Sequence, residues 1–227
     1  MKLAIIIIAM LGAFCILPAL GEYTADYWAG QADREFFLGS YEKAAANYDK
    51  ALELDPSNIV LLNNKGRALA NLGRFDDAIA CFNRTLEINT SNDEALTLKG
   101  IALSQGLKRY NEATIYFDLA LMQNPSNFDA WTGKGMALAS YGSLEDALGC
   151  LEQATKLKPQ DPAAWNNKGV VLREMGSYQQ ALNSFNRALE LDPTYEVASQ
   201  NKEYTLQDMS QVNDLNIDTS QETSYYR

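Results

Sequence analysis

The chain has 227 residues, with 19 basic and 29 acidic side chains, a formal net charge of -10 and no histidine. An acidic surface repels phosphate backbones, so the composition argues against nucleic acid as a partner. The absence of histidine excludes Ser-His-Asp and Cys-His catalysis and every metal site that needs an imidazole.

Residues 1–21 have the three-part layout of a secretory signal peptide. Lys2 precedes an apolar run that Pro18 ends, and small residues occupy the positions -3 and -1 before Glu22. We expect cleavage at that point, which makes the protein secreted or envelope-associated. The alternative is a membrane anchor retained over residues 3–20, although the apolar run is short for a span. Both predictions place the rest of the chain outside the cytoplasm.

The rest of the sequence is organised as a repeat. Trp131 and Pro159 are separated by the same distance in sequence as Trp165 and Pro193. The repeats cover residues 25–58, 59–92, 93–127, 128–161 and 162–195, so that each has 34 residues except the third, which has 35. The extra residue lies in the turn around Gly106–Arg109.

Each repeat predicts two helices. In the fifth repeat, Trp165 and Gly169 lie on one face of a first helix, and Ala181 and Phe185 lie on one face of a second. The small residues allow the two helices to approach closely. Short polar residues that can cap the first helices are Asn58, Asn92, Asn127 and Asp161, and the glycines that can end them are Gly39, Gly73, Gly142 and Gly176.

These repeats resemble the tetratricopeptide repeat (TPR), with the pattern W-x2-L-G-x2-Y, A-x3-F-x2-A and P. The first repeat departs from it at Glu35, and the second departs at Thr85 and Thr90. The resemblance implies an all-α right-handed solenoid of five helix pairs. The fifth repeat matches through Trp165, Gly169, Leu172, Gly176, Tyr178, Ala181, Phe185, Ala188 and Pro193.

The pattern changes after the fifth repeat. Residues 196–207 combine a few apolar side chains with many polar ones, which is typical of a helix that caps the last repeat. Residues 208–227 are rich in Ser, Thr, Asn, Asp and Gln, and we predict a disordered tail there.

The resemblance also implies a concave groove, lined by the first helices, that holds a peptide or a protein segment. From the residues themselves we expect no cofactor, no metal and no catalytic residue, because no carboxylate pair is set for acid-base catalysis and the turns lack the ligand spacing of a calcium loop. The candidate groove residues are Asn63, Arg67, Thr97, Ile101, Thr132, Met136, Asn166, Val170 and Arg173.

Some TPR proteins hold an acidic C-terminus in a clamp that contains lysine. The lysine positions of that clamp are occupied here by Ala29, Asn63, Thr97, Thr132 and Asn166, so the clamp is absent. Lys65, Lys99, Lys134 and Lys168 fall at another position of the repeat, and we interpret them as structural.

Two further patterns concern covalent chemistry. Cys81 and Cys150 occupy equivalent positions with a whole repeat between them, so we expect free thiols rather than a disulfide. Asn89 and Asn83 begin glycosylation triplets, and the turn position of Asn89 makes it the better acceptor.

Together these patterns predict an extracytoplasmic TPR module or scaffold that binds a protein or peptide partner and is not an enzyme. One alternative is a membrane-anchored assembly or secretion factor. Another, from a different class, is the accessory subunit of an enzyme.

N-terminal sequencing of the mature protein tests the first segment. We expect the chain to begin at Glu22, because the small residues before it suit signal peptidase. A chain that still carries residues 3–20 would support the anchor instead.

Overall fold

A computed structural model describes residues 23–222 of the chain, and the predicted signal peptide lies outside this range. Within it the secondary structure is entirely helical, which confirms the all-α prediction. None of these helices is both long and apolar enough to cross a membrane. The elements are α2 (Ala25–Phe37), α3 (Tyr41–Leu54), α4 (Ile59–Asn71), α5 (Phe75–Ile88), α6 (Asp93–Ile101), the π-helical turn η1 (Ala102–Gly106), α7 (Tyr110–Gln123), α8 (Phe128–Tyr141), α9 (Leu144–Leu157), α10 (Pro162–Glu174), α11 (Tyr178–Leu191) and α12 (Glu196–Glu222).

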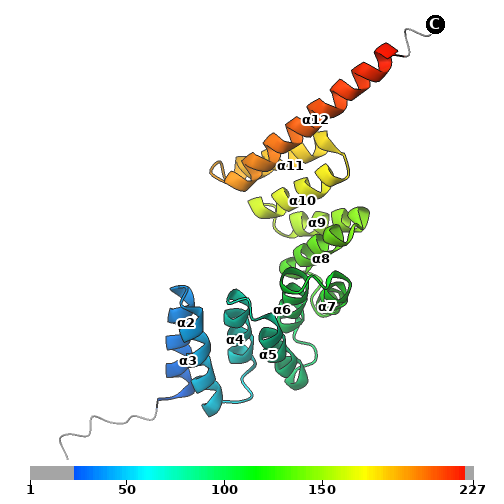
Figure 1. The fold of residues 1–227 in the computed structure, drawn as a ribbon. Helices are drawn as coiled ribbons and strands as arrows, with labels where there is room; N and C mark the ends of the chain where they lie inside the picture. The colour runs from blue at the N-terminus through cyan, green and yellow to red at the C-terminus, as the bar shows by residue number, and fades with distance from the viewer. Residues whose placement is uncertain (1–22, 223–227) are drawn as a thin grey trace, which may run out of the picture. The chain divides into compact units, whose positions relative to one another are not determined.

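The chain divides into two compact units between Ile88 and Asn89. The first unit contains α2 to α5, and the second contains α6 to α12 (Figure 1). Within each unit consecutive helices pack against each other as antiparallel pairs, one pair for each predicted repeat. The helix pairs therefore follow the sequence repeat.

In the first unit, the core lies between the two helices of each pair. Ala32 of α2 and Tyr48 of α3 are both buried. Gly66 of α4 faces Phe82 of α5 so closely that a Cβ atom at Gly66 would lie 2.4 Å from the ring. A helix with any larger residue at this place could not approach its partner to the same distance.

The second unit repeats this arrangement. A Cβ atom at Gly100 would lie 2.7 Å from Phe117, and one at Gly169 would lie 2.5 Å from Phe185. In the fourth repeat, Gly135 faces the smaller Leu151 in the same way. The predicted close approach of the two helices through small residues is thus present in all three pairs.

The ends of the helices follow the predicted signals. The side-chain oxygen of Asn127 accepts a hydrogen bond from Ala130 N at 2.9 Å, and Asn58, Asn92 and Asp161 cap their helices similarly. Gly39, Gly73, Gly142 and Gly176 all have positive φ, in the region that glycine adopts without strain. Both sets of predictions are confirmed.

The third repeat accommodates its extra residue in two linked features. The end of its first helix widens into the π-helical turn Ala102–Gly106. Lys108 then takes the left-handed conformation, with φ 54°, one residue later in the repeat than the glycines of the others. The π turn absorbs the insertion, so Gly100 and Phe117 still meet.

The repeated lysines connect neighbouring helix pairs. Lys65 Nζ lies 2.5 Å from Asp49 Oδ1 in the first unit. In the second unit, Lys134 Nζ lies 2.6 Å from Asp118 Oδ1, and Lys168 Nζ lies 3.2 Å from Glu152 Oε1. Each partner belongs to the second helix of the preceding repeat, which supports the structural interpretation of these lysines.

The last helix differs from the prediction. α12 runs from Glu196 to Glu222, past Gln207, so the disordered tail predicted from residue 208 is wrong for residues 208–222. No glycine or proline interrupts this stretch, and Asp208 holds it to α10 through an ion pair with Arg173 at 2.6 Å. Over residues 196–211, where the side chains of α12 are described, more than half of the residues are exposed, so a polar composition there is that of a solvated helix.

The close contact between paired helices predicts the effect of adding a single methyl group. Gly169→Ala should lower the free energy of unfolding by about 1–3 kcal/mol, because its Cβ would overlap the buried ring of Phe185. Gly149→Ala is the matched control, since nothing lies within 4 Å of a Cβ there. It should be neutral or stabilise by up to about 1 kcal/mol. Urea denaturation of both variants measures the difference, and equal midpoints would contradict the packing argument.

Candidate functional site

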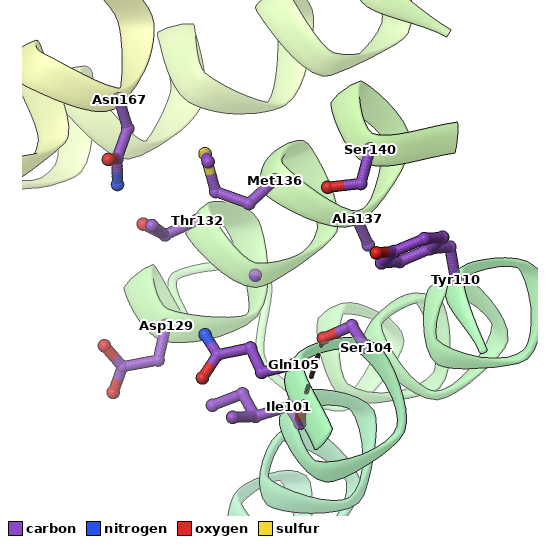
Figure 2. Close-up of a pocket in the computed structure, with 11 residues that line it drawn as sticks. Ile101, Ser104, Gln105, Tyr110, Asp129, Thr132, Met136, Ala137, Ser140 and Asn167 are labelled. Carbon is purple, nitrogen blue, oxygen red and sulfur yellow. Dashed lines mark hydrogen bonds between the residues drawn. The ribbon is translucent and has the colours of Figure 1, made fainter. Parts of the chain in front are cut away.

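A pocket of about 490 Å³ lies in the second unit, over the first helices of the third and fourth repeats (Figure 2). Its size is within the usual range of ligand pockets. The side chains that line it come from α6, η1, α8, the start of α7 and α10. They are Ile101, Ser104, Gln105, Tyr110, Asp129, Thr132, Gly133, Met136, Ala137, Ser140 and Asn167.

Helix α8 supplies the main wall of the pocket. Asp129, Thr132, Met136 and Ser140 recur at a spacing that brings them to one face of a helix. Figure 2 shows Asp129, Thr132 and Met136 projecting to the same side of α8, with Gln105 and Ile101 below them and Asn167 above.

Gly133 lines the pocket at the place where α8 approaches Phe117 of α7. The equivalent positions of the other four repeats hold Gly30, Asn64, Leu98 and Asn167. A Cβ at Gly133 would lie 2.6 Å from the Phe117 ring, so α8 can lie against α7 here only because the residue has no side chain. Gly133 thus sets how closely α8 and α7 pack beside the pocket.

The structure brings three of the predicted groove residues together. Ile101, Thr132 and Met136 all line the pocket, although they come from two different repeats. Thr132 also has an unusual hydroxyl group. Its Oγ1 is buried and has no hydrogen-bond partner among the described residues.

Three predicted residues are buried instead of lining an accessible surface. Asn63, Thr97 and Asn166 are each less than 5% exposed. Asn63 Oδ1 accepts a hydrogen bond from Thr85 at 2.9 Å, and Thr97 Oγ1 donates to Asp93 O at 2.7 Å. We therefore correct their assignment from ligand contact to internal hydrogen bonding.

Helix α12 covers the end of the predicted groove. Asn201 Nδ2 donates to Asn166 Oδ1 at 2.9 Å, and Arg173 Nε donates to Asp208 Oδ2 at 2.6 Å. Arg173 also lies over the ring of Tyr204. Asn166 and Arg173 thus hold the cap in place, which the sequence analysis did not foresee.

The remaining predicted residues lie away from the pocket. Val170 packs against the core cluster around Leu172 and Phe185. Arg67 belongs to the first unit, where it lies over the ring of Phe36. Asn89, the better glycosylation acceptor, is exposed in the turn after α5, while Asn83 lies on α5 itself. Glycosylation stays a prediction.

Sequence reasoning missed most of the polar lining. Ser104 and Gln105 reach the pocket from the π-helical turn, and Asn167 does so from the position next to the predicted Asn166. The extra residue of the third repeat was the signal that marks this place in the sequence, whereas Gly133 has a counterpart in Gly30 of the first repeat.

The titratable groups outside the pocket are in structural settings. Burial raises the pKa of Cys81 and Cys150, so both free thiols stay protonated at neutral pH. Burial, then the hydrogen bond to Asp33, raises the pKa of Tyr48. Burial lowers the pKa of Lys134, but its hydrogen bond and ion pair with Asp118 outweigh this effect and raise the pKa overall.

Among residues 23–222 no cluster of side chains is arranged to hold a metal ion.

Paired helices of this length, in which a glycine meets a large side chain in four of the five pairs, define a helical-repeat protein of the solenoid class. Family models agree at the level of sequence. Tetratricopeptide repeat models match residues 38–101 and residues 162–195, and a TPR repeat model matches residues 135–176. The chain belongs to the tetratricopeptide repeat family.

Solved structures show the same fold. YrrB, described as a TPR protein with an unusual peptide-binding site, is 26% identical with a TM-score of 0.59 and covers 81% of this chain and 94% of its own. MamA is 25% identical with a TM-score of 0.61, over 71% of this chain and 94% of its own. TTC0263 of Thermus thermophilus, at 19% identity, has a TM-score of 0.69 over 81% of this chain and 100% of its own. No curated protein sequence matches the chain.

The unpartnered hydroxyl of Thr132 predicts a gain in stability on its removal. Thr132→Val should raise the free energy of unfolding by about 1 kcal/mol, because a buried hydroxyl without a partner destabilises the folded state. Thr85→Val, the same change at a buried hydroxyl that donates to Asn63, should lower it by about 1 kcal/mol. Thermal denaturation compares the two, and two shifts of the same sign would contradict the assignment of Thr132.

Proposed function

We propose that this TPR-type interaction module binds a segment of a partner protein in the pocket beside α8. The single observation that carries the proposal is the pocket itself. It combines apolar walls with several hydroxyl and amide groups, which suits a peptide better than a flat protein surface.

The family supports this proposal. Among the similar structures is YrrB, whose description names a peptide-binding site. Tetratricopeptide repeat proteins generally act as scaffolds, so we propose that the mechanism is binding without any bond chemistry. The composition of residues 1–21 supports a location outside the cytoplasm, and that location is also a proposal.

A steric block in the pocket tests the proposal. Ser140→Trp places a large ring at the exposed edge of the pocket without changing charge, and we expect at least a tenfold loss of partner capture. The measurement is quantitative mass spectrometry of proteins that the immobilised mature chain retains from an extract of its own cells.

Ser126→Trp is the control, because Ser126 is exposed in the turn before α8 and outside the pocket. It should retain the same partners as the unmodified protein. If Ser140→Trp also retains them all, the pocket is not the binding site.

A further inference from the structure

The charge of the pocket restricts what it can hold. Asp129 is the one charged residue among those that line it, and no lysine or arginine is among them. Within residues 23–222, Asp129 forms no ion pair and its carboxylate accepts no side-chain hydrogen bond. The charge of the pocket lining is therefore negative, like the net charge of -10 of the whole chain.

Three other carboxylates of the second unit are paired with basic side chains, whereas Asp129 is not. In the second unit, Asp118 and Glu152 pair with lysines, and Asp208 pairs with Arg173. Asp129 instead lies exposed in the first turn of α8. The helix dipole favours an acidic residue in the first turn of α8. The dipole explains the negative charge of Asp129 but does not explain why Asp129 lies at the mouth of the pocket.

The rest of the lining suits a long side chain with a polar end. Ile101, Met136 and Ala137 supply an apolar wall, and methionine adapts its shape to what it contacts. The side chains of Gln105 and Asn167 project toward the same space in Figure 2 and carry carbonyl oxygens that can accept hydrogen bonds.

The features that form the pocket occur together at the junction of the third and fourth repeats. The π-helical turn brings Ser104 and Gln105 to it, and Gly133 lets α8 lie close to α7 beside it. In the described part of the chain no other helix contains a π-helical turn. Single π turns of this kind occur often at binding sites, because they redirect side chains out of the regular helical pattern.

We propose that this pocket holds the side chain of a lysine or arginine from the partner segment. Its apolar stem lies against Met136 and Ile101, and its charged head lies at the mouth beside Asp129. The proposal rests on the proposed function and specifies its ligand. An acidic side chain is disfavoured because it meets a carboxylate and no cation, and a wholly apolar one leaves Asp129 and the amides without a partner.

Methyl NMR of the full chain tests the proposal directly. The probes are four blocked pentapeptides, acetyl-Ala-Ser-Xaa-Ser-Ala-amide, in which Xaa is lysine, arginine, norleucine or glutamate. Met136 and Ile101 carry the reporter methyl groups, since both line the pocket. Norleucine is the matched probe for lysine, because it keeps the stem and lacks the charge.

We expect saturable shifts of both methyl signals with the lysine and arginine peptides, and binding about fivefold or more weaker with norleucine and glutamate. Asp129→Asn should remove this preference for the basic peptides. Asp146→Asn, an exposed carboxylate on α9 outside the pocket, should leave it unchanged.

The outcomes separate the two proposals. If the norleucine or glutamate peptide binds as tightly as the lysine peptide, recognition of a basic side chain is wrong while peptide binding in the pocket stands. If Asp129→Asn keeps the preference, the assigned role of Asp129 is wrong. If no peptide shifts either methyl signal at about 10 mM, the inference fails. The proposed function is then still decided by the capture experiment, in which it holds if Ser126→Trp retains the partners and Ser140→Trp does not.

Discussion

The contact between a glycine of the first helix and a large side chain of the second sets the geometry of the second to fifth repeats. Phe82, Phe117 and Phe185 are almost fully buried, and each ring fills the space that a side chain on the facing helix would need. Interiors packed at this density do not yield to an added methyl group. The helix pair therefore has one distance of approach and one register, and the hydrogen-bonded caps and left-handed glycines fix where each helix begins and ends.

This contact also explains the irregular third repeat. Gly100 and Phe117 are one residue further apart in sequence than Gly66 and Phe82, yet they meet in the same way. The extra residue is taken up between them, by the π-helical turn and by Lys108 in a left-handed conformation. A local departure from the α-helix costs less than breaking a buried contact, and the departure redirects Ser104 and Gln105 into the pocket.

Much of the fold followed from the sequence because its signals are local and repeated five times. Helix pairs, caps and terminating glycines all depend on a residue and its near neighbours. The candidate site was predicted less well. Ile101, Thr132 and Met136 line the pocket, whereas Asn63, Thr97 and Asn166 are buried, because the family pattern marks a position on a helix and not its exposure. The length of α12 was also missed, since a polar composition describes a solvated helix as well as an unstructured tail.

By itself, then, the sequence determined the all-α class, the five repeats and the pairing of their helices, since spacing alone specifies which residues share a helical face. Only the tertiary structure decided which of those helical faces remain accessible to a ligand. Asn166 and Arg173 engage α12, Thr97 accepts a hydrogen bond from Asn127 at the start of the next repeat, and the space between α6 and α8 stays open as the pocket. These outcomes depend on which side chains meet across repeats, and such contacts join residues that no local pattern connects.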